Sequence, residues 1–169
     1  VLVRSGRGQE PFLAVTDPEH DYFSGHGAER VWPAALTLAS FLLAQPCRGL
    51  RVVELGAGCG LPGLAMARRG AEVLLTDVPW LLSLAAYNAE ANFVAEDPLC
   101  PSVAPLRWGN ANDAAALLAK WGRPDLAIGA DVVYQESDFD PLLASVEALG
   151  APEAVLCIVH RDTVVSAFL

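Results

Sequence analysis

Basic residues are scarce in this chain and do not cluster. Eleven lysines and arginines face 20 aspartates and glutamates, which gives a net charge of −9, and Lys120 is the single lysine. The largest basic cluster is the pair Arg68 and Arg69. A nucleic-acid-binding protein needs a basic surface for the phosphates, so we expect no nucleic-acid partner. The acidic balance favours a cationic partner, such as a lysine-rich protein segment, or serves only solubility.

Long hydrophobic runs and paired cysteines are also lacking. No apolar run reaches the roughly 18 residues that span a bilayer, and no basic segment followed by an apolar run opens the chain, so we expect neither membrane association nor a secretory signal. The four cysteines are widely spaced, without a C-x-x-C pair. This spacing argues against a zinc site and for reduced thiols in a reducing compartment. We therefore expect no bound metal and a cytoplasmic location, with the nucleus as an alternative.

The composition is that of a folded domain, with 53% hydrophobic and 18% charged residues over 169 positions. A chain of this length suffices for one sizeable core. We expect a single domain over residues 1–169. Residues 1–50 would form an N-terminal strand, loop and helix, and residues 51–169 an α/β core.

Short β-type runs alternate with helical stretches from residue 51 onward. The expected strands are Arg51–Leu55, Glu72–Thr76, Ser102–Leu106, Asp125–Gly129 and Ala154–Val159. The expected helices are Leu61–Arg69, Trp80–Phe93, Ala111–Lys120, Asp138–Leu149 and Thr163–Leu169, and the first 50 residues add a strand at Phe12–Thr16, a loop at Asp21–Glu29 and a helix at Val31–Leu43. Such alternation predicts right-handed crossovers and a doubly wound, mostly parallel, Rossmann-like sheet.

The first expected strand of the core runs into a glycine-rich loop with glycines at 56, 58 and 60. A dinucleotide site requires G-x-G-x-x-G, and here the third glycine comes one residue early. Glu54 also precedes the loop, where it would repel a phosphate. The loop therefore suits a ligand with a cationic amino-acid end and no phosphate, such as S-adenosyl-L-methionine, whose ammonium group Glu54 would take up. A structural turn in another α/β fold is the alternative.

Asp77 ends the second expected strand of the core, 21 positions after Gly56. A carboxylate at the carboxyl end of the neighbouring strand can accept both ribose hydroxyls of an adenosine. Taken alone, Asp77 would equally serve as a helix N-cap. Together with the glycine loop, it favours an adenosine site.

Three further motifs narrow the interpretation: V-W-P-A-A from Val31, L-R-W-G from Leu106 and A-D-V-V-Y from Ala130. With E-L-G-A-G-C-G and L-T-D, they stand in the order found in the family-16 seven-β-strand methyltransferases, which this chain resembles over about residues 30–160. That group includes the lysine methyltransferases of chaperones, elongation factors and AAA ATPases. The resemblance implies methyl transfer from S-adenosyl-L-methionine to a lysine of such a protein substrate.

The resemblance also assigns roles to single residues. The cofactor would be bound by Trp32, Glu54, Gly56, Ala57, Gly58, Asp77, Trp108 and Ala130, and the substrate lysine by Asp131 and Tyr134. In this assignment the three loop residues line the methionine end, Asp77 binds the ribose, and Trp108 packs against the adenine. Asp131 would orient the ammonium group, while the Tyr134 ring would attract it by a cation–π interaction.

Several of these assignments have structural alternatives. Trp32 and Trp108 could be core residues, and Tyr134 could cap a loop. Asn88 and Asn92 match an asparagine-rich stretch of the family, and we expect them to dock their helix onto neighbouring loops.

The resemblance stops short of the family's full sheet, which normally ends in two more strands, the last antiparallel. Strands six and seven have no counterpart in these 169 residues, so we expect a core truncated at its C-terminus. We expect a monomer. Two other functions remain open: methylation of a small molecule or of another protein residue, and a catalytically silent module that binds the cofactor.

Overall fold

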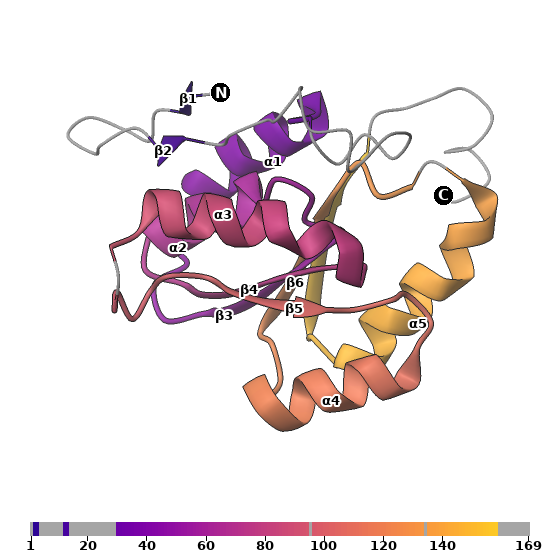
Figure 1. The fold of residues 1–169 in the computed structure, drawn as a ribbon. Coiled ribbons are helices and arrows are strands. Elements are labelled where there is room, and N and C mark those ends of the chain that lie inside the picture. Colours follow the sequence, from indigo (N-terminus) through magenta and orange to yellow (C-terminus); the bar gives the residue numbers. More distant parts are fainter. Residues whose placement is uncertain (1, 4–11, 14–29, 95, 134, 159–169) are drawn as a thin grey trace.

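A five-stranded parallel sheet forms the centre of the protein (Figure 1). The structure, a computed structural model, describes residues 2–3, 12–13, 30–94, 96–133 and 135–158. The strands are β3 (Arg51–Leu55), β4 (Glu72–Asp77), β5 (Ser102–Pro105), β6 (Leu126–Ala130) and β7 (Glu153–Cys157), in the order β5-β4-β3-β6-β7. Two short antiparallel strands, β1 (Leu2–Val3) and β2 (Phe12–Leu13), pair separately.

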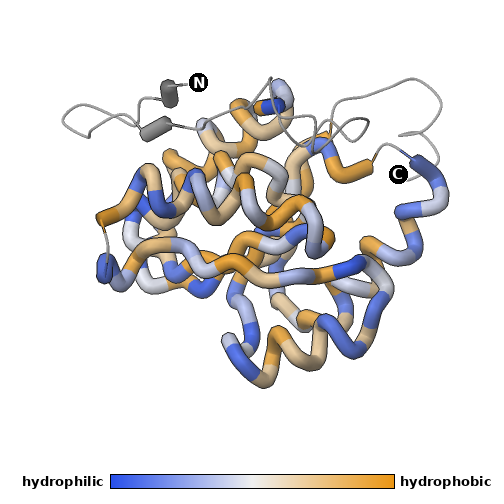
Figure 2. Tube along the Cα trace, in the orientation of Figure 1, coloured by the Kyte–Doolittle hydropathy of each residue, from blue (hydrophilic) through white to orange (hydrophobic). Residues whose placement is uncertain are grey.

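Helices cover both faces of this sheet. The first face carries α1 (Pro33–Leu43), α2 (Leu61–Arg68) and α3 (Leu82–Asn92), and the second carries α4 (Ala111–Trp121) and α5 (Phe139–Leu149). Successive strand residues point to opposite faces, so Val52 joins the core of the first face and Val53 that of the second. Figure 2 shows the hydrophobic residues concentrated along the strands. The fold is therefore the doubly wound α/β architecture expected from the sequence.

Local signals in the sequence set the ends of several helices. Asn110 caps α4, because its side-chain oxygen accepts hydrogen bonds from the backbone N–H groups of Asn112 and Asp113. Pro33 opens α1, where no intrahelical N–H donor is needed. Gly150 ends α5 with a φ of 64°.

The observed elements differ from the predicted ones mainly at their ends. The helix expected from Trp80 begins with a 3₁₀ turn, η2 (Pro79–Leu81), and another, η3 (Glu136–Asp138), precedes α5. The strand expected over Phe12–Thr16 is described only at Phe12–Leu13. The loop expected at Asp21–Glu29 and the helix expected at Thr163–Leu169 lie outside the described residues.

The strand order places a topological switch point in the middle of the sheet. From the central strand β3, the chain adds β4 and β5 on one side and then β6 and β7 on the other. Crossovers that lead in opposite directions leave a crevice at the carboxyl ends of the strands, where ligands bind in open α/β sheets. Among the described helices, none is long and apolar enough to cross a membrane.

Candidate functional site

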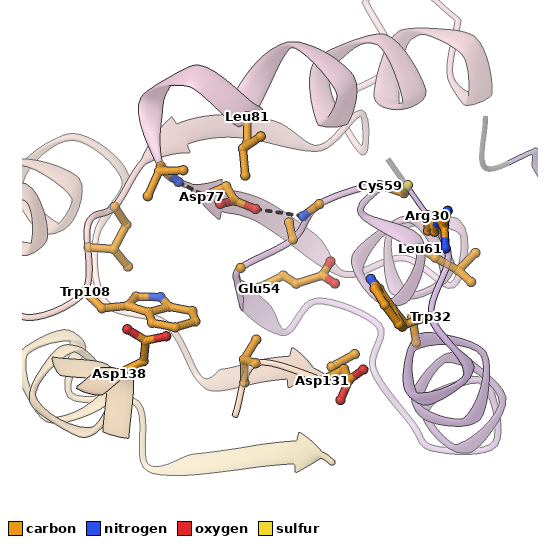
Figure 3. Close-up of a pocket in the computed structure, with 18 of the residues that line it drawn as sticks. Arg30, Trp32, Glu54, Cys59, Leu61, Asp77, Leu81, Trp108, Asp131 and Asp138 are labelled. Atoms are coloured by element: carbon orange, nitrogen blue, oxygen red, sulfur yellow. Dashed lines mark hydrogen bonds between the residues drawn. The ribbon is translucent and has the colours of Figure 1, made fainter. Parts of the chain in front are cut away.

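A pocket of about 400 Å³ lies at the carboxyl ends of β3, β4 and β6, at this switch point (Figure 3). The structure brings together nine of the ten residues predicted to form the site, and they all line this pocket: Trp32, Glu54, Gly56, Ala57, Gly58, Asp77, Trp108, Ala130 and Asp131. Tyr134, the tenth, lies outside the described residues. The convergence of residues 32 to 131 on one pocket is a result of the tertiary fold.

The glycine loop between β3 and α2 depends on backbone conformations that favour glycine. Gly56, Gly58 and Gly60 have φ angles of 59°, 51° and 75°. Gly56 is also closely covered, because a Cβ there would lie 3.0 Å from the Trp108 ring. Trp108 thus packs on the loop and lines the pocket at once, and its predicted contact with the adenine stays a prediction.

Asp77 links the end of β4 to the glycine loop by a hydrogen bond. Its Oδ2 accepts a hydrogen bond of 2.8 Å from the Gly58 N–H, and its Oδ1 accepts one of 2.8 Å from the Val78 N–H (Figure 3). Burial raises the pKa of the Asp77 carboxyl, while both hydrogen bonds act to lower it. A carboxylate has about four acceptor positions, so the two N–H groups leave capacity for the hydroxyls of a ligand.

Glu54 has a partner that the sequence did not predict. Its Oε2 accepts a hydrogen bond of 2.8 Å from the Gly63 N–H in the first turn of α2. The side chain is buried, and desolvation raises its pKa to about 8, with Asp77 contributing in the same direction. An acid near a helix start is the signal that could have revealed this contact. The predicted contact of Glu54 with a ligand ammonium group stays a prediction.

Two tryptophans border the pocket from opposite sides in Figure 3. Trp32 precedes the first turn of α1 and is 36% exposed, so it is not a core residue. Trp108, between β5 and α4, is partly buried against the core of the second face. An apolar pocket with aromatic walls and a few convergent polar groups is typical of small-molecule sites.

Asp131 directly follows β6 and points toward the same pocket. Its φ of 56° is a left-handed conformation that is uncommon outside glycine. The Asp131 N–H donates to the Cys157 carbonyl at 2.8 Å, which ties the turn to β7. Such strained positions concentrate at functional sites, and here the strain aims a buried carboxylate into the pocket.

Several residues that line the pocket were not predicted from the sequence, among them Trp80 and Asp138. Trp80, in η2, is 60% exposed although it lines the pocket, and Asp138 reaches the pocket from η3. Their only signal is position, since each lies in the 3₁₀ turn that follows the carboxyl end of a strand.

The predicted docking role of the two asparagines is confirmed for Asn88. Asn88 is buried in α3, and its Nδ2 donates to the Cys59 carbonyl in the glycine loop at 2.9 Å. The Asn92 Nδ2 donates to the Asn88 carbonyl at 2.7 Å. The Asn88 bond docks α3 onto the glycine loop, whereas the Asn92 bond lies within the helix.

Among the described residues, no group of three or more histidine, cysteine, aspartate or glutamate side chains is arranged to hold a metal ion. The four cysteines form no disulfide.

The fold and the site together define a doubly wound α/β domain with a ligand pocket at its switch point. The chain belongs to the lysine methyltransferase family, whose model matches residues 18–168. It is 37% identical over 133 residues to protein N-lysine methyltransferase METTL21A of Danio rerio, covering 78% of this chain and 59% of the relative. It is 35% identical over 136 residues to EEF1A lysine methyltransferase 3 of Mus musculus, covering 79% of this chain and 56% of the relative.

Solved structures support the fold. Magnesium protoporphyrin IX methyltransferase from Synechocystis PCC 6803, crystallised with bound SAM, superposes with a TM-score of 0.53 at 21% identity, covering 79% of this chain and 64% of that one. This chain thus has a Rossmann-like methyltransferase fold and spans rather more than half the length of the two protein relatives.

Proposed function

We propose that this protein binds S-adenosyl-L-methionine and transfers its methyl group to a lysine side chain of a protein substrate. The main support is that the glycine loop, Asp77 and Asp131 converge on one pocket, in a chain that belongs to the lysine methyltransferase family. The relatives named as protein-lysine methyltransferases support this reaction.

The residues of the pocket fit this cofactor. Asp77 has acceptor capacity left for ribose hydroxyls, and the glycine loop exposes backbone without a Cβ at three positions. The volume of about 400 Å³ lies in the range of small-molecule sites. Trp32 and Trp108 offer apolar walls for the uncharged parts of the ligand. When bound, S-adenosyl-L-methionine supplies a methyl group activated by a positively charged sulfur.

The chain itself has mainly to position and desolvate the acceptor amine. Asp131 is buried at the pocket, so its carboxylate can orient an incoming lysine ammonium group. The amine must lose its proton to water before it attacks, and burial of the amine favours that loss. Tyr134 is the second residue proposed to hold the amine, by a cation–π interaction.

The proposed substrate class is a protein such as a chaperone, an elongation factor or an AAA ATPase. The relative named for EEF1A supports the second of these. The net charge of −9 suits a basic segment around the target lysine. We place the protein in the cytoplasm, or the nucleus, as a monomer.

Incubation with methyl-labelled cofactor and a cell lysate tests the proposal. We expect a labelled protein band whose label maps to methyl-lysine. Asp131→Asn should abolish the transfer while cofactor affinity stays largely intact, and Asp140→Asn, the same change at an exposed position of α5, should leave both unchanged.

Other outcomes would contradict the lysine assignment. Label in the small-molecule fraction or on methyl-arginine would point to another acceptor. Cofactor binding without any transfer would point to a silent binding module.

A further inference from the structure

A second pocket, of about 660 Å³, lies at the opposite end of the molecule from the first. It is lined by Pro46, Cys47, Arg48, Leu50, Arg68 and Arg69. Arg48 and Leu50 lead into the amino end of β3, and Arg68 and Arg69 end α2, which runs antiparallel to that strand. Three arginines therefore meet at one pocket, although the chain has only 11 basic residues.

Each of the three guanidinium groups lies beside an uncharged neighbour. Arg48 lies near Gly70, where an added Cβ would be 3.3 Å from its terminal nitrogen. Arg68 lies over the Phe93 ring, with its Cζ 5.0 Å from the ring centroid. Arg69 lies near the Cys47 thiol and acts to lower its pKa. These contacts orient the cations without neutralising them.

The ion pairs found among the described residues use other arginines, since they join Arg51 to Glu72 and Arg107 to Asp113. No acidic residue lines this pocket within the described part of the chain. The positive charge of the arginines also acts on the buried Cys47 thiol. Burial raises the pKa of this thiol, while Arg69 and Arg48 both act to lower it. Three cations that line one pocket repel one another, and a bound anion would relieve that repulsion.

Guanidinium groups present paired N–H donors in a plane, which match the oxygens of a phosphate group. We propose that the pocket formed by Arg48, Arg68 and Arg69 is an oxyanion site that binds a phosphate group. Free phosphate or pyrophosphate and a phosphorylated side chain of a protein share this chemistry.

Titration of the isotopically labelled protein with pyrophosphate at low ionic strength, followed by amide chemical shifts, tests this site. We expect saturable shifts confined to residues near the pocket, such as Cys47, Gly49 and Gly70. Binding should weaken as salt rises, because the arginines are exposed to solvent. The same titration with inorganic phosphate and with a phosphoserine peptide distinguishes the sources: tighter binding of the peptide assigns the site to a phosphoprotein, and equal binding assigns it to the free anion.

Arg69→Gln should weaken pyrophosphate binding about tenfold, as expected for the loss of a charge-assisted hydrogen bond. Arg68→Gln should act in the same direction, and because Arg68 lies over the Phe93 ring, this variant guards against an indirect effect through Cys47. Lys120→Gln removes the same charge from α4 and should change the affinity less than twofold, about the effect of a weak, screened surface charge. The absence of saturable shifts, or equal weakening by Lys120→Gln, would overturn the proposal. Cofactor binding should be unchanged in all three variants, so this test is independent of the proposed methyl transfer.

Discussion

The two ends of the central sheet carry opposite chemistry. At the carboxyl ends of the strands, Glu54 and Asp77 are buried carboxyls whose pKa values are raised. At the amino ends, arginines dominate and remain accessible, as in the pair of Arg51 with Glu72. The carboxyl end contains desolvated carboxyls and strained turns, both of which lower the stability of the fold. Such features are typical of sites organised for a ligand. At the amino end, the Arg51–Glu72 pair is partly solvated and therefore costs little desolvation.

The largest expected effect concerns the packing of glycines at the two ends. In Gly63→Ala, the new Cβ would lie 2.5 Å from Leu75 Cδ2 and 2.6 Å from Glu54 Oε2. We expect the free energy of unfolding to fall by about 3 kcal/mol, measured by urea denaturation. Gly49→Ala is the control at the amino end: no atom lies within 4 Å of its Cβ, and its φ of +80° should cost only about 1 kcal/mol. Equal losses of unfolding free energy in the two variants would contradict the proposed difference between the two ends of the sheet.

The second effect concerns cofactor affinity. Asp77→Ala should weaken binding of S-adenosyl-L-methionine about a hundredfold in calorimetry, because a carboxylate that accepts ligand hydroxyls is lost. Asp77→Asn keeps one acceptor oxygen, so its affinity for the cofactor should lie between that of the parent and that of Asp77→Ala. Asp125→Asn removes an equal charge at the amino end, where Asp125 accepts from the Arg51 N–H, and should leave affinity unchanged. An unaltered affinity in Asp77→Ala, with the fold intact by thermal melting, would refute the assignment.

The third effect is a pH dependence of stability caused by Glu54. Its pKa is about 8 in the fold against an ordinary 4.5, so the folded protein keeps a proton that the unfolded chain loses between these values. Its stabilising contribution is complete below pH 4.5 and is lost as the pH rises to about 8, at about 1.4 kcal/mol per pH unit. Glu54→Gln should reduce this slope in urea denaturation between pH 5 and 8, leaving the part that other groups contribute, such as Asp77 with its raised pKa.

A carboxyl with the opposite shift is the control for this slope. Arg107 lowers the pKa of Asp113 to about 2, so its contribution is present above pH 3.8 and is lost only as the pH falls through about 2. Asp113→Asn should therefore leave the slope between pH 5 and 8 unchanged. A slope that persists unchanged in Glu54→Gln would show that other groups, and not Glu54, cause it.

The smallest effect is expected at the amino end. The Arg51 Nε and the Glu72 Oε2 are 3.4 Å apart, and the two side chains are 32% and 51% exposed. Glu72→Gln should lower the free energy of unfolding by less than about 0.5 kcal/mol, because water and salt screen exposed ion pairs. Denaturation with and without 1 M salt checks this, as added salt should erase the difference between the variant and the parent. A larger loss would mean that the amino end also depends on charge pairing.

The sequence predicted the order of the elements and the position of the site. The strand Arg51–Leu55 has the predicted bounds, and most other elements shift by one or two residues at their ends. These predictions succeed because apolar patterns, caps and glycine turns act within a few neighbouring residues. The short turns η2, which begins at Pro79, and η3 were missed, since a 3₁₀ turn and the first turn of a helix leave similar patterns.

The sequence by itself determined the alternation of strands and helices, and it marked Asp77 and Asp131 as residues at strand ends. Only the tertiary structure decided what their neighbours are. Glu54 meets the Gly63 N–H, Trp80 and Asp138 reach the pocket rim, and Arg48 joins Arg68 and Arg69 at the far end of the sheet. The physical reason is that a side chain's partners are set by which chain segments pack together, and burial then sets its charge state. Neither the packing partners of a side chain nor its charge state can be read from local sequence patterns.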